Sequence, residues 1–458
     1  MDALQSSLPI KSAPSTSART PIDVLTSPFT RFAKMEASGG ILLLAATVLA
    51  LVWANSPWEH SYHMLWEQEV TAGFGHTILT WSRHLWVNDG LMSIFFFLVG
   101  LEIKRELLIG ELSSFQQAAF PFIAALGGCL FPAALYFAVN RGGPAANAWG
   151  IPMATDIAFA LGVLTLLGDR VPVSLKLFVA ALAIADDIIV VLVIAVFYTA
   201  HLNFLYLAFG AVGLCISYGA NKAGVRNPWV YAFIGIVVWF AVMQSGVHAT
   251  IAGVMLAFTI PCSGSSGKPR FVAKMQRLVQ RFDAAEPDSA EAHAALHAME
   301  EQCALMESPL HRIEHALQPW VSFAIMPLFA FSNAGVHVLG KLLIAAKNPV
   351  TLGVALGLLA GKPFGITAFA WAAEKVRLAS RPAGVNWTQI FAASWVCGIG
   401  FTMSLFIAAL VFPEGEPLDL AKIGTLAASI IAGSIGSFLL LRSQKAEATI
   451  VAEDPLAH

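Results

Sequence analysis

At 458 residues the chain is long enough for several soluble domains, but its composition excludes that class of protein. Hydrophobic residues make up 57% of the sequence and charged residues 12%, whereas soluble proteins carry about 25% charged residues. A net charge of −2 gives no basis for nucleic-acid binding, and the five scattered cysteines show neither a disulfide framework nor zinc-ligand spacing. The composition therefore predicts an all-α polytopic membrane protein.

The first segment, residues 1–36, is polar and rich in Ser, Thr and Pro. It lacks the apolar core and cleavage site of a signal peptide, so we expect a flexible cytoplasmic tail. Residues 37–442 are expected to form one transmembrane domain, followed by a cytoplasmic tail at 443–458. Apolar stretches predict about twelve spans within that domain, at 37–55, 86–107, 115–139, 148–168, 172–198, 202–219, 228–244, 246–261, 318–338, 349–373, 389–413 and 419–442.

The distribution of basic residues predicts the orientation. With the N-terminus inside, 21 of the 27 Lys and Arg residues fall on the cytoplasmic side, as the positive-inside rule requires. Both termini are therefore expected to be cytoplasmic. A cytoplasmic insertion at 262–317 contains two amphipathic helical stretches near 271–282 and 288–305, and a connection this long is often functional.

Two adjacent carboxylates, Asp186 and Asp187, lie at the centre of the apolar run 172–198. This run is roughly 40 Å long as a helix, enough to cross a bilayer with some tilt. A carboxylate at the centre of a span costs about 2.5–3.5 kcal/mol on insertion scales. Such a cost indicates a function, and cations and protons are the obvious candidates.

Further polar groups are predicted at the same depth: Thr155 and Asp156 in the fourth span, and Lys362 in the tenth. The fourth span contains Pro152, and the eleventh contains Gly398 and Gly400, so both spans are expected to be interrupted. Interrupted helices in two halves point to a transport site at the midplane. We expect Asp156 to neutralise positive half-helix N-termini there and Lys362 to neutralise negative C-termini.

The charges of these groups do not balance. Three carboxylates and one amine leave excess negative charge, which a monovalent cation or protons must compensate. Neighbouring helical residues diverge by about 100°, so Asp186 and Asp187 cannot face one partner equally. We favour pairing of Asp186 with Lys362 and cation coordination by Asp187, although the sequence alone does not order the two.

Seven motifs in order resemble the NhaA family of bacterial sodium/proton antiporters. The likeness runs from about residue 31 to 442 and is carried by Phe95–Leu107, Ala154–Gly162, Leu182–Asp187, Ser245–Thr250, Pro327–Gly335, Gly361–Pro363 and Cys397–Ser404.

The resemblance implies about twelve helices with inverted-topology repeats, the interrupted fourth and eleventh helices crossing at the midplane. It implies an inner-membrane transporter that moves Na⁺ or Li⁺ out of the cell while a larger number of protons enters. The family's ion-binding site maps onto Asp186 and Asp187, with Asp156, Thr155 and Lys362 in support. The ionised aspartates would hold either Na⁺ or H⁺, which gives exchange when the site changes sides only in an occupied state.

The resemblance also implies regulation and assembly. A cytoplasmic pH-response region maps onto Glu102, Arg105, Glu106, His248 and Glu314. Family members form homodimers through a β-hairpin after the first helix. Residues 56–85 occupy that position, although their sequence is not recognisably strand-like.

Three other hypotheses compete with antiport. His311-Arg-Ile-Glu-His315 matches a zinc-protease pattern, but no further motif nearby suggests a third ligand. An intramembrane aspartyl protease would pair Asp156 with Asp187, a role that Lys362 would disrupt. A sodium-coupled solute symporter on a related fold is the alternative within transport, and it predicts an enclosed pocket suited to an organic solute. We expect no enzyme activity and no cofactor.

Overall fold

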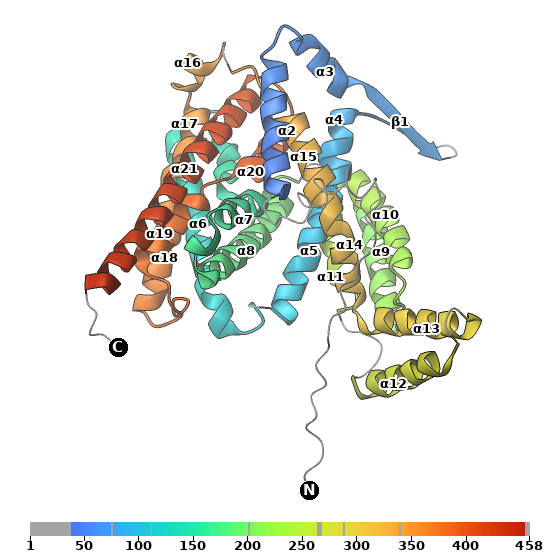
Figure 1. The fold of residues 1–458 in the computed structure, drawn as a ribbon. Coiled ribbons are helices and arrows are strands. Elements are labelled where there is room, and N and C mark those ends of the chain that lie inside the picture. Colours follow the sequence, from blue (N-terminus) through green and yellow to red (C-terminus); the bar gives the residue numbers. More distant parts are fainter. Residues whose placement is uncertain are drawn as a thin grey trace.

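The computed structural model describes residues 38–74, 77–110, 112–199, 202–262, 268–286, 289–338 and 340–453. These residues are mostly helical (Figure 1), and the chain is an all-α polytopic membrane protein. The predicted tail at 1–36 lies outside the described residues. At the other end, the last helix continues to Glu453, beyond the predicted span that ends at 442.

Ser or Asn side chains cap many of the helix N-termini, for example Ser114, Asn203 and Asn386, as expected for residues that accept a hydrogen bond from a free backbone N–H. The elements of the N-terminal half are α2 (Ser38–Ala54), α3 (Glu59–Glu67), β1 (Glu69–Phe74), β2 (Thr77–Ser82), α4 (Arg83–Leu85), the π-helical turn η1 (Trp86–Leu91), α5 (Met92–Leu108), α6 (Phe115–Asn140), the 3₁₀ segment η2 (Ala146–Met153), α7 (Ile157–Leu166), the 3₁₀ turn η3 (Gly168–Arg170), α8 (Val173–Phe197) and α9 (Phe204–Lys222).

The elements of the C-terminal half are α10 (Pro228–Gln244), α11 (Ala249–Thr259), α12 (Lys268–Ala284), α13 (Ala290–Met306), α14 (Pro309–Trp320), the π-helical turn η4 (Val321–Ile325), α15 (Met326–Asn333), α16 (Leu342–Ala345), α17 (Pro349–Leu356), the π-helical turn η5 (Gly357–Gly361), α18 (Lys362–Lys375), α19 (Trp387–Val396), α20 (Phe401–Val411) and α21 (Glu416–Glu453).

Seven helices within the described residues are long and apolar enough to span a membrane, and nine if each sharply bent helix pair is one span. One such pair, α19 and α20, is bent by 48° around residues 397–400. The apolar helices α10 and α11 are shorter than the seven. The number of twelve spans thus stays a prediction.

A β-hairpin lies in the segment that we judged not to be strand-like, and that judgement was wrong. Strands β1 and β2 pair antiparallel, from Glu69 opposite Ser82 to Phe74 opposite Thr77. The segment contains Val, Ile, Thr and Trp, residue types that favour strands. The strands are only six residues each, too short to give a strong alternating pattern.

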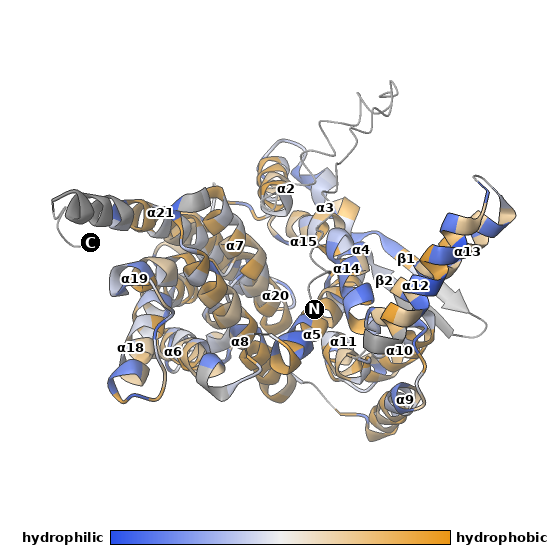
Figure 2. Ribbon diagram, turned by 60° about the horizontal axis from the view of Figure 1, so that its bottom comes forward, coloured by the Kyte–Doolittle hydropathy of each residue, from blue (hydrophilic) through white to orange (hydrophobic). Residues whose placement is uncertain are grey.

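Two helices, α12 and α13, form most of the insertion, close to the two stretches predicted at 271–282 and 288–305. They lie at the end of the bundle opposite the hairpin (Figure 1). Figure 2 shows many hydrophilic residues on them, whereas most of the bundle is coloured hydrophobic. The insertion is therefore a polar extension at one end of an apolar bundle.

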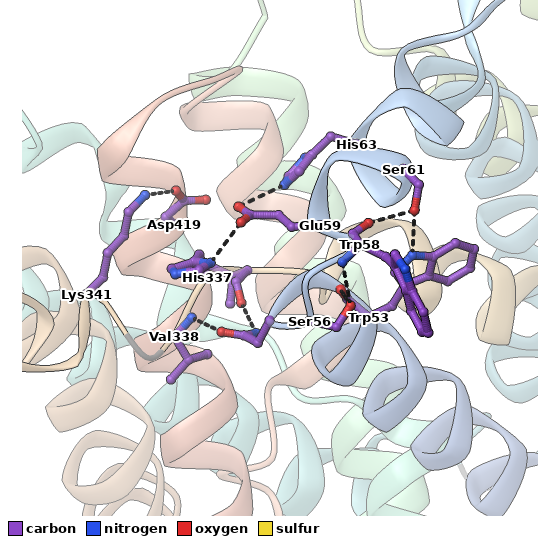
Figure 3. A network of polar contacts seen from close by, with 12 residues as sticks. Trp53, Ser56, Trp58, Glu59, Ser61, His63, His337, Val338, Lys341 and Asp419 are labelled. Atoms are coloured by element: carbon purple, nitrogen blue, oxygen red, sulfur yellow. Dashed lines mark hydrogen bonds and ion pairs between the residues drawn. The ribbon is translucent and has the colours of Figure 1, made fainter.

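Polar contacts at the hairpin end of the bundle tie distant segments together (Figure 3). Glu59 lies 3.8 Å from His63 of its own helix and 3.4 Å from His337, which follows α15. Lys341 Nζ donates to Asp419 Oδ2 at 2.6 Å and so joins the α15–α16 connection to the start of α21. These contacts involve half-exposed side chains, so each contributes little to stability.

Candidate functional site

The two central aspartates lie on α8, an uninterrupted helix whose residues 181–187 are all buried. Asp186 is 0% exposed and Asp187 is 2% exposed. Lys362, also 0% exposed, donates from Nζ to Asp186 Oδ2 at 2.6 Å. The structure therefore pairs the buried amine with the first aspartate of the two.

Glycine contacts bring α18, which carries Lys362, unusually close to α6. A Cβ atom on Gly361 would lie 2.6 Å from Pro132 Cα, so no larger residue fits there. Gly365 packs in the same way, because its Cβ would lie 2.8 Å from Phe131 Cβ. The π-helical turn η5 ends directly before Lys362, and such turns are frequent at functional sites.

Asp187 lacks a partner on one of its oxygens. Its Oδ1 atom is buried and accepts no hydrogen bond within the part of the chain that the structure describes. The carboxyl group interacts electrostatically with Asp186, Glu102, Asp156 and Lys362. A buried carboxylate oxygen without a donor is costly, and a hard cation or a proton is the ligand that would relieve this cost.

Both carboxylate oxygens of Asp156 accept hydrogen bonds from groups around them. It caps α7 by accepting from Phe159 N at 2.9 Å, and its second oxygen accepts both the backbone N–H of Thr402, at 3.1 Å, and the Thr402 hydroxyl. In addition, Asp156 N donates to Ile399 O at 2.8 Å, and Thr155 Oγ1 donates to Cys397 O at 3.0 Å. The break at 154–156 is thereby joined to the break at 397–400.

Asp156 therefore meets helix N-termini, the partners that we expected for it. Lys362 meets one of the two partners expected for it, because the pair with Asp186 is the one that the sequence favoured, but it does not meet a helix C-terminus. Its observed hydrogen bond goes to Asp186, not to carbonyl groups at a helix C-terminus. The reason is proximity, since a full carboxylate charge beside the amine outweighs the partial charge of a helix end.

Four of the five residues predicted for the pH-response region lie at one end of the bundle. Arg105 forms an ion pair with Glu314 of α14 and another with Glu106, at 3.1 Å. Glu102 lies one turn earlier on α5 and interacts electrostatically with Arg105, Glu106 and Glu314. These four side chains form one charged cluster between α5 and α14.

His248 is not part of this cluster, so the structure does not bring the five predicted residues together in one region. It precedes α11, and its Nε2 lies 2.7 Å from Tyr198 O at the end of α8. The other end of α11 approaches the charged cluster, because Lys104 donates to Phe258 O at 2.7 Å. Roughly 16 Å of helix therefore separates His248 from the four other residues.

The histidine pattern at 311–315 does not assemble a zinc site in this structure. The rings of His311 and His315 lie 6.4 Å apart, and Glu314 is bound to Arg105 instead of being free as a general base. Across the described ranges, no group of three or more His, Cys, Asp or Glu side chains could hold a metal ion.

A cavity of about 1130 Å³ has a lining that does not include the aspartates. It lies among α5, α10, α11, α14 and the hairpin, and its lining includes Trp86, Trp229 and Trp239 but no carboxylate. The solute-symport hypothesis needs an enclosed pocket with groups for an organic solute. A mostly apolar cavity away from the charged site does not provide that.

Our sequence reasoning missed two side chains of the site. Cys129 donates to Asp186, and the Thr402 hydroxyl donates to Asp156. A cysteine in an apolar helix has the sequence signature of a small buried residue. Only the adjacent pair Gly127-Gly128, which permits close helix packing, marks its position.

The burial of the Asp186–Lys362 pair predicts a stability effect. Lys362→Met leaves an uncompensated buried charge, which costs about 3–5 kcal/mol, so we expect a clearly lower unfolding midpoint in detergent. The double variant Asp186→Asn/Lys362→Met should recover much of the loss.

Lys341→Met is the matched control, because its pair with Asp419 has the same 2.6 Å length but is about one-third exposed. We expect a change below about 1 kcal/mol for this control. Equal effects of the two lysine substitutions would contradict the assignment of a buried pair.

Comparison with known proteins confirms the resemblance seen in the sequence. The family described as Na⁺/H⁺ antiporter 1 matches residues 30–440. A Na(+)/H(+) antiporter NhaA of Koribacter versatilis is 61% identical over 424 residues, 92% of this chain and 93% of that protein. A Na(+)/H(+) antiporter NhaA of Oleidesulfovibrio alaskensis is 49% identical, and a Na(+)/H(+) antiporter NhaA 2 of Helicobacter hepaticus is 45% identical. Each match covers at least 92% of this chain and 96% of the relative. The chain belongs to the Na⁺/H⁺ antiporter 1 family of membrane transporters, whose members exchange sodium ions for protons.

Proposed function

We propose that this antiporter moves cytoplasmic Na⁺ or Li⁺ outward in exchange for a larger number of protons, across the inner membrane of a bacterium. The observation that supports this most directly is the buried Oδ1 of Asp187, which has no hydrogen-bond donor among the described residues, beside a complete Asp186–Lys362 pair. Asp187 is then the group that holds a cation or a proton, but not both.

The exchange cycle follows from this competition. Na⁺ binds the ionised Asp187 from the cytoplasm, the site opens to the outside, and a proton displaces the cation. If Lys362 leaves Asp186 and exchanges a proton in the same cycle, more than one H⁺ moves per Na⁺ and transport is electrogenic. Electroneutral exchange in proteoliposomes, unaffected when the membrane potential is clamped, would contradict this proposal.

The topology belongs to the same proposal. The breaks at 154–156 and 397–400, joined by hydrogen bonds to each other, support the fourth and eleventh of twelve spans as crossing interrupted helices related by an inverted repeat. Both termini and the α12–α13 insertion would then be cytoplasmic. Labelling of single cysteines placed in the insertion, in intact cells with an impermeant reagent, tests the orientation, and external labelling would contradict it.

Loss of the Asp187 charge should abolish exchange. In everted vesicles, addition of Na⁺ or Li⁺ to the wild type should dissipate a pH gradient reported by a quenched dye. Asp187→Asn should give no response at any pH, because an amide neither binds the cation as a charged ligand nor carries a proton.

Asp283→Asn, an exposed carboxylate on α12, is the control and should exchange like the wild type. Exchange in Asp187→Asn would remove this residue from the ion path. Failure of well-expressed wild type at every pH would contradict antiport itself.

We also propose that the charged cluster between α5 and α14 contributes to pH regulation. Burial raises the pKa of the Glu314 carboxyl, while Arg105 and His311 oppose that shift and Glu106 adds to it. Glu314 is therefore ionised above its raised pKa, and its pair with Arg105 weakens as the pH falls through that pKa. Low pH would release the contact between the two helices.

Glu314→Gln imitates the protonated residue at every pH, so its activation profile should move toward alkaline pH. The profile is measured as the dye response across a pH series. Glu300→Gln provides the control, since Glu300 lies on the exposed face of α13. A Glu314→Gln profile that overlays the wild type would exclude this role.

We propose that the hairpin β1–β2 joins two copies of the chain in a homodimer. Figure 1 shows the hairpin extending away from the helices, and the described outer residues Glu69–Thr71 are exposed. An unpaired strand edge offers backbone groups to a second copy.

Replacement of residues 69–82 by a short Gly-Ser linker should therefore give a monomer in native mass spectrometry. Shortening of the α12–α13 insertion, at the other end of the bundle, should leave the dimer intact. A dimer that survives removal of the hairpin would contradict this interface.

A further inference from the structure

Both oxygens of Asp186 accept a hydrogen bond, and each comes from a different helix. Lys362 of α18 donates to Oδ2 at 2.6 Å, and the Cys129 thiol of α6 donates to Oδ1 at 2.8 Å. All three side chains are at most 1% exposed. A thiol is a weak donor, but a charged acceptor strengthens the bond.

The direction of the thiol is fixed by helix packing. Cys129 directly follows Gly127 and Gly128, where α6 lies against α18. A Cβ on Gly128 would lie 2.8 Å from Ile366 Cγ1, so this face of α6 has no room to rotate or move toward α18. The cysteine side chain therefore projects between α18 and α8, onto the carboxylate.

Packing alone would not require this contact. Cys397 is the comparison, because it is equally buried at 1% exposure and also lies near Lys362 and Asp186. Within the described part of the chain its thiol makes no hydrogen bond to a carboxylate, while its backbone carbonyl accepts from Thr155. Of these two buried thiols, only that of Cys129 is bound to a charged oxygen of the ion site.

We propose that Cys129 is a positioning residue of the transport cycle, whose thiol holds Asp186 in its pair with Lys362 and keeps that carboxylate away from the transported cation. The proposal rests on the proposed function. It divides the site into a held carboxylate, Asp186, and an open carboxylate, Asp187, whose Oδ1 has no donor.

Removal of the donor should alter how the cation is bound. Without the thiol, Asp186 Oδ1 becomes available as a second carboxylate ligand, so Na⁺ should bind more tightly and leave more slowly. A hydrogen bond of this kind corresponds to roughly a three- to ten-fold change in an equilibrium constant. We therefore expect the apparent KM for Na⁺ to fall by about that factor, with an equal or lower maximal rate.

Three substitutions separate the donor from the volume of the side chain. Cys129→Val approximates the shape without a donor, Cys129→Ala removes both, and Cys129→Ser keeps a donor in a smaller side chain. Exchange in everted vesicles, measured over a range of Na⁺ concentrations, should show a lower KM for Val and Ala and a near-wild-type KM for Ser. Cys215→Ala, at an exposed position on α9, controls for loss of a thiol.

The outcomes distinguish this inference from the proposed function. If the wild type exchanges and the KM for Na⁺ is unchanged in Cys129→Val and Cys129→Ala, only the role of Cys129 is overturned. The same KM shift in all three variants, Cys129→Ser included, would also overturn that role. Lack of exchange in the wild type would instead overturn the proposed function.

An infrared measurement tests the hydrogen bond without transport. The wild-type minus Cys129→Ser difference spectrum of purified protein should contain an S–H stretching band at lower frequency than that of a free thiol. Asp186→Asn should move this band toward the free value, because the charged acceptor is lost. A band at the free-thiol position in the wild type would overturn the proposal even where the Val and Ala variants fail to fold.

Discussion

The constraint on which the site depends is excess negative charge in a buried, low-dielectric interior. The structure compensates the three carboxylates unequally. Asp156 receives donors from α7 and from the start of α20, and Asp186 receives the Lys362 amine and the Cys129 thiol. Asp187 Oδ1 receives none from the described residues. Asp187 is the preferred place for a cation or proton because both oxygens of Asp156 and both oxygens of Asp186 already accept hydrogen bonds.

This arrangement depends on backbone approaches that only small residues permit. Gly361 lets α18 reach Pro132 of α6, and a Cβ on Gly398 would lie 2.7 Å from Leu358 O. The break at 397–400 therefore packs directly against the π-helical turn that precedes Lys362. A shift of either helix would be transmitted to the amine through rigid contacts, since packed interiors move between discrete arrangements.

Much of the site could be predicted from the sequence, because charges in apolar spans are conspicuous. The count of three carboxylates and one amine was enough to suggest a buried pair and an open carboxylate.

The sequence could not predict that Cys129 contacts Asp186, because this contact depends on the rotation of α6 between α8 and α18. The position of His248 could have been deduced, because the predicted topology places the start of the eighth span opposite the cytoplasmic ends. The hairpin was missed because two six-residue strands without a core give little periodicity.

The charged cluster and the ion site are linked through α5. Glu102 interacts electrostatically with Arg105 and Glu314 on one side and with Asp187 on the other. A change in the charge of Glu314 therefore alters the field at Glu102, and Glu102 in turn acts on Asp187, the carboxylate that we propose binds the cation. Such interactions are strong in an interior that screens them poorly. The proposed response to pH thus needs no large movement to begin, because a change of charge at the helix end already changes the free energy of the ionised Asp187.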